Sequence, residues 1–386
     1  GLRPRGTMSV RALPLAKALV RRGHAVTLLL PPWQNPEDAG GTWDDEGVRI
    51  ENAPLPAGLP GWFHLRLTAR LTRRALALRP DVIHAFKPKA YAGLVHWMLH
   101  HRPGAPPVVV DTDDWEGPGG WNDLRDYAPP LKRLFAWQER WGLRHAATVT
   151  VASRALQTLA WAQGGEPARV VYLPNGVAWP HPPVDTAPHP RPTLLLYTRF
   201  FEYEVARLWA RVQRVKAARP DLRLWVVGKG FFGEEQQLMS LAREAGWRVS
   251  ESADAVDADL VYAGYVPAAR LPAHFAQADV ALYPFDDTLV NRTKCPVKLL
   301  DLLAAGLPVV ADAVGEIEAM IHPGETGLLV APGDAAAFAE VVLDLLDDPA
   351  RRKALGQRAA ADVRARFGWD ALAVQAERGY RYAMDS

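Results

Sequence analysis

The stretch from Lys294 to Asp312, KCPVKLLDLLAAGLPVVAD, constrains this chain more than any other segment. It predicts a short helix that begins at Pro296, a stop at Gly306 and then a buried strand, because proline suits the first turn of a helix and glycine its end. Lys298 and Asp301 lie three residues apart on a helix that is otherwise apolar nearly all round. They therefore share one face of a helix that we expect to be buried.

Two interpretations of this charged face remain open at this point. If the helix N-terminus is aimed at a ligand, its free N–H groups and the Lys298 cation suit a diphosphate, and the Asp301 carboxylate suits a ribose diol. The alternative is an ordinary salt bridge between positions i and i+3 on a half-exposed helix. The rest of the sequence has to decide between them.

Length and composition place the chain among two-domain globular proteins. Its 386 residues exceed one ordinary core, and 49% hydrophobic with 23% charged residues is a typical globular composition. The single cysteine, Cys295, excludes an internal disulfide and fits a reducing compartment. No apolar run approaches the roughly 18 residues of a membrane span and no signal peptide is visible, so we expect a cytoplasmic protein.

The positive charge is concentrated in the first half of the chain. Residues 1–180 contain 22 Lys and Arg against 15 Asp and Glu, whereas residues 181–386 contain 23 against 28. Within the first half, Gly61–Arg79 predicts a basic amphipathic helix headed by Trp62 and Phe63. It is either an ordinary surface helix or a contact for an anionic membrane, which would place the protein peripherally at the inner membrane face.

Apolar strand patterns alternate with helical patterns along the whole chain. Strands are expected at 25–30, 81–85, 108–111, 147–151, 170–173, 194–198, 224–227, 260–264 and 309–312. This alternation predicts an α/β protein with doubly wound parallel sheets, in which ligands bind beyond the carboxyl ends of the strands. Six prolines between Trp179 and Thr193 indicate a semi-rigid linker, so we expect domains at 1–183 and 184–386.

Polar residues follow two strands of the first half. His84 ends one strand and is followed by Lys87 and Lys89, and VVVDTDDWEGPGGW ends another strand with Asp111, Asp113 and Asp114. Three carboxylates within four residues repel one another unless they are paired, solvated or metal-bound, so some should titrate abnormally. Near the start, the Gly6-Thr7 loop before a helix suits a phosphate or is a plain turn.

The run PVKLLDLLAAGLPVVA, with VGEIEAMIHPGETGLLVAPGD after it, resembles the nucleotide-binding signature of the retaining group 1 glycosyltransferases of the family 4 type. The resemblance extends from about Gly6 to Tyr382. It implies the GT-B fold, with two facing Rossmann-like domains, the first for the acceptor and the second for a nucleotide sugar. It also implies that Asp301 binds the donor ribose and that the last helix crosses back to the first domain. The first strand of the family, which precedes the Gly6 loop, is absent from this sequence.

The resemblance assigns further donor-site residues in the second half. Arg199 matches an arginine that clamps the donor diphosphate, but the lysine expected five residues later is Glu204. Lys298, Lys294 or Lys229 would then supply the second cation. The turn Gly228-Lys229-Gly230 matches a turn near the nucleotide, and Tyr265-Val266 matches a segment whose backbone reads the base.

Two positions depart from the family around the transferred sugar. Thr293 stands where the family has a glutamate eight residues before Asp301; its hydroxyl can still hydrogen-bond a sugar. Asp113-Asp114 stands where members often have a His-Asp pair, so only Asp114 matches. An aspartate there is a general base, which implies inversion, or orients the sugar in a retaining reaction, or only caps backbone N–H groups.

The sequence therefore predicts a glycosyltransferase that moves a sugar from a nucleoside diphosphate sugar to a glycan or lipid-linked acceptor, with retention implied by the resemblance. Arg199 and Lys298 would stabilise the leaving diphosphate, and no motif requires a metal or another cofactor. No nucleic-acid-binding motif is present. Two alternatives remain: a catalytically degenerate nucleotide-sugar-binding or partner protein, and a nucleotide-sugar epimerase that recruits His84 and Asp113.

Overall fold

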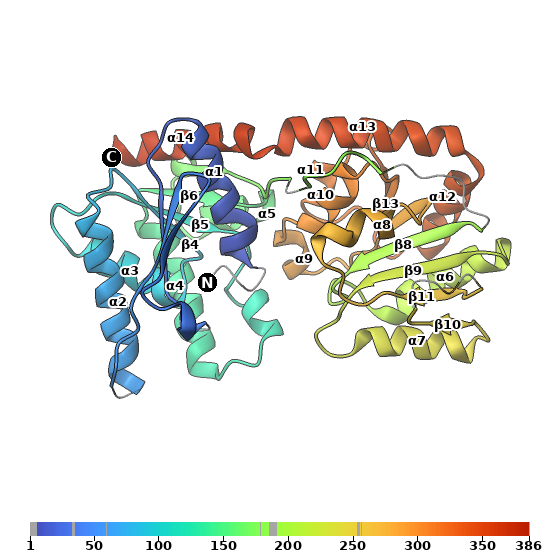
Figure 1. The fold of residues 1–386 in the computed structure, drawn as a ribbon, viewed down its shortest axis with the longest axis horizontal. Coiled ribbons are helices and arrows are strands. Elements are labelled where there is room, and N and C mark those ends of the chain that lie inside the picture. Colours follow the sequence, from blue (N-terminus) through green and yellow to red (C-terminus); the bar gives the residue numbers. More distant parts are fainter. Residues whose placement is uncertain are drawn as a thin grey trace. The chain divides into compact units, whose positions relative to one another are not determined.

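The computed structural model describes residues 6–32, 35–58, 60–177, 179–184, 191–252, 255 and 257–385 (Figure 1). The chain divides into two compact units. Unit 1 comprises Gly1–Gly176, Thr293–Cys295 and Phe367–Ser386, and unit 2 comprises Val177–Arg292 and Pro296–Arg366. The predicted linker, 179–193, follows this division and lies within unit 2, and its residues 185–190 are outside the described residues.

Unit 1 contains two sheets. The first has the order β1-β3-β2, from β1 (Thr27–Leu30), β2 (Thr42–Asp45) and β3 (Val48–Asn52), with β1 parallel and β2 antiparallel to β3. The second is parallel throughout, with the order β4 (Ile83–Phe86), β5 (Val108–Thr112), β6 (Thr148–Val151) and β7 (Val170–Tyr172). Within the described residues, no strand pairs with the free edge of β4, so the two sheets are separate.

Helices cover these sheets. They are the π-helix η1 (Met8–Ala12), α1 (Leu13–Arg21), α2 (Pro60–Ala77), α3 (Ala90–His100), α4 (Pro129–His145), α5 (Arg154–Ala162) and α14 (Trp369–Met384), with 3-10 turns η2 (Pro36–Asp38), η3 (Trp121–Leu124) and η4 (Pro167–Arg169). The C-terminal α14, red in Figure 1, packs against α1 and against β6. Gly379 permits this contact, because a Cβ there would lie 3.3 Å from the Thr148 methyl group.

Unit 2 has one seven-stranded parallel sheet in the order β10-β11-β9-β8-β12-β13-β14. The strands are β8 (Thr193–Thr198), β9 (Arg223–Gly228), β10 (Val249–Ser250), β11 (Leu260–Tyr262), β12 (Val280–Tyr283), β13 (Val309–Asp312) and β14 (Leu328–Val330). The helices are α6 (Val205–Ala218), α7 (Glu234–Glu244), α8 (Leu271–Phe275), α9 (Leu289–Thr293), α10 (Val297–Ala304), α11 (Ile317–Met320), α12 (Ala335–Asp347) and α13 (Pro349–Phe367), with the 3-10 turn η5 (Ala268–Arg270). Both units are thus α/β and each contains a parallel sheet, as the alternating pattern predicts, while the small sheet of unit 1 is mixed.

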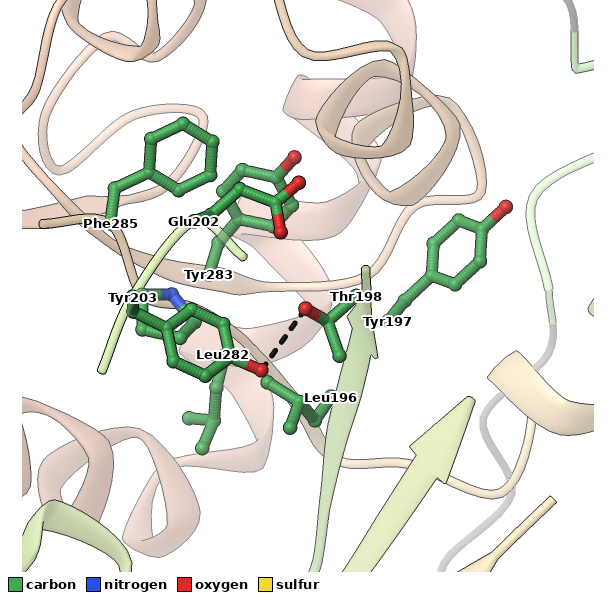
Figure 2. Close-up of a pocket in the computed structure, with 9 residues that line it drawn as sticks. Leu196, Tyr197, Thr198, Glu202, Tyr203, Leu282, Tyr283 and Phe285 are labelled. Atoms are coloured by element: carbon green, nitrogen blue, oxygen red, sulfur yellow. Dashed lines mark hydrogen bonds between the residues drawn. The ribbon is translucent and has the colours of Figure 1, made fainter. Parts of the chain in front are cut away.

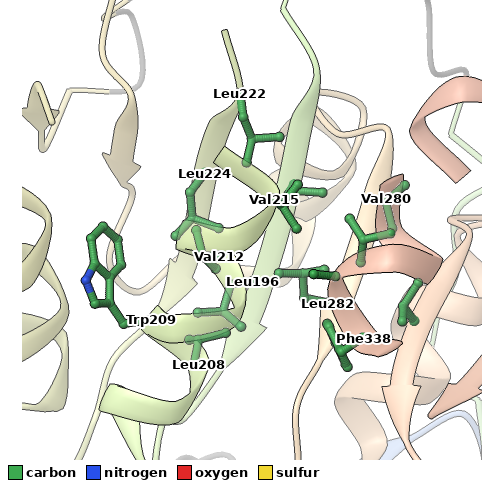
Figure 3. Close-up of a cluster of buried hydrophobic side chains, with 14 of the residues drawn as sticks. Leu196, Leu208, Trp209, Val212, Val215, Leu222, Leu224, Val280, Leu282 and Phe338 are labelled. Atoms are coloured by element: carbon green, nitrogen blue, oxygen red, sulfur yellow. The ribbon is translucent and has the colours of Figure 1, made fainter. Parts of the chain in front are cut away.

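The core of unit 2 lies between the central strands and two helices (Figure 3). Leu196, Leu224 and Leu282 from β8, β9 and β12 are fully buried against Val212 of α6 and Phe338 of α12. Central strands buried on both faces read as continuous apolar runs, which is why β8 and β9 were recognisable in the sequence, whereas β12 was not predicted. Among the described residues, no helix is both long and apolar enough to cross a membrane.

In unit 1, a buried carboxyl of α4 faces the end of β5. Thr112 Oγ1 donates to Glu139 Oε1 at 2.8 Å, while Glu139 Oε2 has no hydrogen-bond partner among the described residues. Burial, together with the nearby negative charge of Glu116, raises the pKa of Glu139 from 4.5 to about 8. Glu139 is therefore protonated at neutral pH in the folded chain.

This protonated carboxyl generates a prediction for pH-dependent stability. An acid whose pKa is higher in the folded than in the unfolded chain keeps its proton on folding, so the free energy of unfolding falls as pH rises from about 4.5 to 8. Glu139→Gln keeps an oxygen that can accept from Thr112 but cannot ionise. Melting temperatures measured from pH 5 to 8.5 should therefore decline less in Glu139→Gln than in the wild type. The exposed Glu325→Gln is the control; equal declines in all three proteins would contradict the assignment.

A second prediction concerns the core of unit 2. Phe338 has no exposed surface, and the Arg211 guanidinium carbon lies 4.5 Å from the centre of its ring. Phe338→Ala should lower the free energy of unfolding by about 3–5 kcal/mol, because it removes buried apolar surface and leaves a cavity. Chemical denaturation measures this, with the exposed Phe232→Ala as the control, for which we expect a change within about 0.5 kcal/mol. A loss below about 1 kcal/mol in Phe338→Ala would contradict the packing described.

Candidate functional site

The charged helix α10 begins at Val297, one residue later than expected, with Pro296 in extended conformation before it. Asp301 is 3% exposed, so its carboxylate is buried as predicted. Lys298 is half-buried, and its Nζ lies 3.3 Å from the centre of the Tyr197 ring at the end of β8. The face shared by Lys298 and Asp301 is thus directed to the carboxyl end of the sheet of unit 2.

A small pocket lies at the same ends of β8 and β12 (Figure 2). Its lining residues are Leu196, Tyr197, Thr198, Glu202, Tyr203, Leu282, Tyr283, Pro284 and Phe285. The Tyr203 hydroxyl donates to Thr198 Oγ1 at 3.0 Å. Burial raises the pKa of Tyr283 well above its ordinary value, and the charges of Glu202 and Asp301 add to this effect. Tyr197, another lining residue, is the ring that Lys298 Nζ contacts, so the pocket adjoins α10.

The loop after β8 carries Arg199 in a constrained backbone. Phe200, the next residue, has a φ of 70°, and its N–H donates to Thr198 Oγ1 at 2.7 Å. A non-glycine residue in this region is strained and persists only where the surroundings hold it. Arg199 itself is half-buried, with its guanidinium carbon 6.0 Å from the centre of the Phe231 ring. The loop thus holds a cation at the strand end.

Glu204, where the family has lysine, lies away from this pocket. It is the residue before α6, is exposed, and forms an ion pair with Arg207 at 3.0 Å. The carboxylate of Glu204 is therefore not among the residues that line the pocket. The buried acid of the pocket is Glu202, two residues earlier, which the sequence analysis did not single out.

The glycine turn after β9 is needed for a close approach of two backbones. Gly228 has a φ of 131°, and a Cβ there would lie 1.9 Å from the Thr198 carbonyl oxygen, so only glycine fits. The N–H of Gly230 donates to Glu235 at 3.1 Å and is not available to a phosphate in this conformation. Lys229 is exposed.

The neighbouring strand β11 is followed by the segment expected to read the base. Gly264 accepts a hydrogen bond from the Gly228 N–H at 2.7 Å, so the two turns lie side by side. After it, Val266 is buried and Tyr265 is 71% exposed. Phe231 and Phe232 on the glycine turn are also exposed, an aromatic group that the sequence analysis missed although GKGFFG contains it.

Thr293 belongs with unit 1 in the contact pattern, together with Lys294 and Cys295. Its carbonyl accepts from Ser153 Oγ at 2.7 Å, and the side chain is buried. Asn175 binds Cys295 twice, by its N–H to Sγ at 3.1 Å and by its Nδ2 to the carbonyl at 2.8 Å. The segment that leads into α10 is thus fixed by residues following β6 and β7.

In unit 1 the acidic end of β5 separates into different environments. Asp111 is fully buried and receives Arg11 Nε at 2.8 Å and Nη2 at 2.6 Å, together with Thr150 Oγ1 at 2.6 Å. Asp113 Oδ2 accepts from Thr7 Oγ1 at 2.7 Å, and Asp114 Oδ2 accepts from Lys87 Nζ at 2.7 Å. Asp111 is therefore structural, while Asp113 and Asp114 lie with Lys87.

The expected abnormal titration is present. Burial raises the pKa of Asp113, and the attraction of Lys87 only partly opposes it. For Asp114 the same burial is outweighed by Lys87, with Lys294 and Lys89 adding to it, so the pKa of Asp114 is lowered. The two neighbouring aspartates thus differ in charge state near the acid end of the pH range.

The contacts of two other predicted site residues, Gly6 and His84, favour structural roles. The N–H of Gly6 donates to Ser9 Oγ at 3.0 Å, and Thr7 faces the Asp113 carboxylate, which disfavours a phosphate at this loop. His84 is bound by Thr150 Oγ1 at 3.1 Å and by the Tyr380 hydroxyl at 3.0 Å, and burial lowers its pKa to about 4. In the described part of the chain, no group of three or more His, Cys, Asp or Glu side chains is arranged to hold a metal ion.

Two curated relatives align with most of the chain. A GDP-mannose-dependent alpha-(1-6)-phosphatidylinositol monomannoside mannosyltransferase from Mycolicibacterium smegmatis is 27% identical over 359 residues, covering 87% of this chain and 84% of the relative. A glycogen synthase from Mycobacterium tuberculosis is 25% identical, covering 95% and 88%. Both names describe enzymes that transfer sugars.

Solved structures share the fold at low identity. A sucrose-phosphate synthase from Thermosynechococcus elongatus aligns with a TM-score of 0.73 at 22% identity, covering 97% of this chain and 93% of the other. Anabaena Alr3699/HepE in complex with UDP-glucose aligns with a TM-score of 0.67 at 16% identity, covering 98% and 96%. This structural similarity shows that the chain has the GT-B fold.

Family models account for most of the sequence. Residues 6–176 match the model of the glycosyl transferase 4-like domain, and residues 191–348 match the model of glycosyl transferases group 1. The first match lies within unit 1, and the second lies in unit 2 except for Thr293–Cys295, which belong to unit 1. The chain belongs to the group 1 glycosyltransferases and is a sugar-transferring enzyme.

Proposed function

We propose that this enzyme transfers a sugar, with retention of configuration, from a nucleoside diphosphate sugar to a glycan or lipid-linked acceptor. Unit 2 binds the donor and unit 1 contributes the acceptor side. In the reaction the bond between the anomeric carbon and the diphosphate oxygen breaks, and the acceptor oxygen forms the new bond. The nucleoside diphosphate leaves, and the acceptor proton passes to it.

The observation that carries this proposal is the position of Asp301. Its side chain is buried on α10, and Lys298 on the same helix face lies with its Nζ 3.3 Å from the ring centre of the pocket residue Tyr197. A carboxylate accepts both hydrogen bonds of a ribose diol, and the helix N-terminus with Lys298 and Arg199 supplies positive charge for a diphosphate. These charges stabilise the leaving group, since negative charge grows on it as the bond breaks.

A lipid-linked acceptor is supported by the surface of α2. Trp62 and Leu65 are exposed there beside Arg66 and Arg73. An aromatic and basic helix face suits anionic lipid. The relative from Mycolicibacterium smegmatis is named as a phosphatidylinositol monomannoside mannosyltransferase. Phosphatidylinositol vesicles, glycogen and free D-inositol are therefore the first acceptors to test with UDP-glucose and GDP-mannose. The anomeric coupling constant of the product, read by NMR, tests retention.

Our prediction for the donor site uses thermal unfolding with UDP, GDP and ADP in parallel. One of them should stabilise the protein through mass action, by about 2.7 kcal/mol at a hundredfold excess over its dissociation constant. Asp301→Asn should abolish this stabilisation, because an amide cannot accept both hydroxyls of the ribose. Asp334→Ala is the control, since Asp334 only caps α12 through the Ala337 N–H, and its variant should keep the nucleotide effect.

Failure of all three nucleotides to stabilise the wild type would favour the degenerate alternative over an active enzyme. If a nucleotide still stabilises Asp301→Asn, Asp301 does not bind the ribose. Release of free nucleotide with a transferred sugar, as opposed to a changed nucleotide sugar, separates transfer from epimerisation. The burial of His84 beneath Tyr380 offers no support for an epimerase.

A further prediction separates the two aspartates after β5. Asp114→Asn should lower kcat by about a hundredfold or more, because a carboxylate that orients a sugar hydroxyl loses its charge. Asp113→Asn should have a smaller effect, since its oxygen can still accept from Thr7. Initial rates of nucleotide release measure both, and stabilisation by the nucleotide should persist in both variants. Near-normal turnover in both would exclude any role of this pair in the reaction.

A further inference from the structure

Lys87 stands at the end of β4 directly opposite the acidic end of β5. Phe86 pairs with Asp111 in the ladder, and the Lys87 N–H donates to the Asp111 carbonyl at 2.9 Å. The backbone of Lys87 has a φ of 59°, and that of Ala90 has a φ of 50°. Each costs about 1–2 kcal/mol for a residue other than glycine, so the sequence keeps a lysine where glycine would be easier.

The strained loop is held by α4. Gln138 accepts from the Ala90 N–H at 2.8 Å and donates to the Ala90 carbonyl at 3.1 Å. Gly93 makes room for this contact, because a Cβ there would lie 2.9 Å from the Gln138 amide nitrogen. Strain held by surrounding packing is characteristic of functional positions.

In this backbone conformation, the ammonium group of Lys87 lies close to three carboxylates. Lys87 Nζ lies 2.7 Å from Asp114 Oδ2, 3.1 Å from Asp113 Oδ1 and 3.6 Å from Glu116 Oε1. Lys89, two residues later, is different: its Nζ lies 2.6 Å from Glu116 Oε2 and donates to Asn122. Lys87 therefore contacts the aspartate pair, whereas Lys89 stabilises the loop through Glu116 and Asn122.

The two aspartates leave different oxygens available. Asp113 Oδ2 accepts from Thr7, whereas its Oδ1 is buried, lies 3.1 Å from Lys87 Nζ and has no hydrogen-bond partner among the described residues. Asp114 meets Lys87 through Oδ2, and its Oδ1 has no hydrogen-bond partner among the described residues, with 22% of the side chain exposed. Asp114 can therefore accept a hydrogen bond from a ligand while it stays bound to Lys87.

Other charges around the pair come from several elements. Arg11 of η1 is committed to Asp111, and Lys89 to Glu116. Lys294 acts on Asp114 only through the field of its charge, and Glu139 of α4 is neutral near pH 7. Among the described residues, Lys87 is thus the one cation in direct contact with Asp114.

We propose that Lys87 is a positioning residue for sugar transfer, which binds Asp114 through Oδ2 and turns its Oδ1 to a hydroxyl of the substrate. Asp113 acts as a fixed support bound to Thr7. This inference rests on the proposed function, because it assigns Lys87 a part in the same reaction.

The test compares Lys87→Met, Lys87→Arg and Lys89→Met in the full-length protein. The pKa of Asp114 is read by carbon NMR of aspartate-labelled protein, with the signal assigned by Asp114→Asn. In parallel, the pH profile of kcat/KM is measured by nucleotide release with the donor and acceptor that the wild type uses. Loss of a cation at this distance should raise the carboxyl pKa by about 1–3 units. We expect Lys87→Met to move the acid limb of kcat/KM upward by the same amount, a tenfold loss of rate for each unit at low pH.

Lys87→Arg should restore both the Asp114 pKa and the acid limb, and Lys89→Met should raise both by clearly less than Lys87→Met, because Lys89 makes the smaller contribution to the Asp114 pKa. Equal shifts in Lys87→Met and Lys89→Met would reduce Lys87 to a general structural charge and overturn the inference. It is also overturned if the Asp114 pKa rises in Lys87→Met while the acid limb stays in place. If the wild type transfers no sugar at all, the proposed function fails first, and that result is distinct from both.

Discussion

The buried ion pair between Arg11 and Asp111 is the interaction on which unit 1 depends. The Arg11 guanidinium binds Asp111 in two places, the Leu173 carbonyl at 2.7 Å and Asn175 Oδ1 at 3.2 Å, and neither charged side chain is exposed. One residue of η1 thus ties the end of β5 to the chain after β7. Removing one partner of such a pair leaves an uncompensated buried charge, which commonly costs about 3–5 kcal/mol. The pair fixes the strand end from which Asp113 and Asp114 emerge, and Asn175 extends the same network to Cys295.

In unit 2, the candidate site residues are likewise positioned at the carboxyl end of a parallel sheet. Its seven parallel strands end at a common edge. There β8 supplies Tyr197, the loop after β8 supplies Arg199, β12 supplies Tyr283, and α10 supplies Lys298 and Asp301. Ligands of open α/β sheets bind at this edge, because helix N-termini and strand-end loops converge there. Gly228 passes close to Thr198, and Phe200 next to Arg199 has a φ of 70°, so the backbone of this loop is constrained. In the donor site that we propose, such a constraint would limit the entropy lost on binding.

The sequence was informative where local pattern decides structure. Apolar runs predicted β4 to β7 of unit 1 and β8, β9, β11 and β13 of unit 2, but not β10, β12 or β14. The spacing of Lys298 and Asp301 predicted a shared helix face, because burial and helix periodicity are local properties. It could not show that Glu204 lies outside the pocket or that Glu202 lines it, since both follow from the loop geometry after β8. Lys87 was noted only as a residue after His84. Its contact with Asp114 depends on the register of β4 against β5, which no local pattern encodes.

The central claim is that α10 and the loop after β8 bind a nucleoside diphosphate. A crystal structure of the protein with the nucleotide that it binds most tightly tests this most directly. The account predicts that both ribose hydroxyls lie within hydrogen-bond distance of the Asp301 carboxylate and that the diphosphate contacts Arg199 and the first turn of α10. A nucleotide bound in unit 1, or one in unit 2 whose ribose does not touch Asp301, would contradict it.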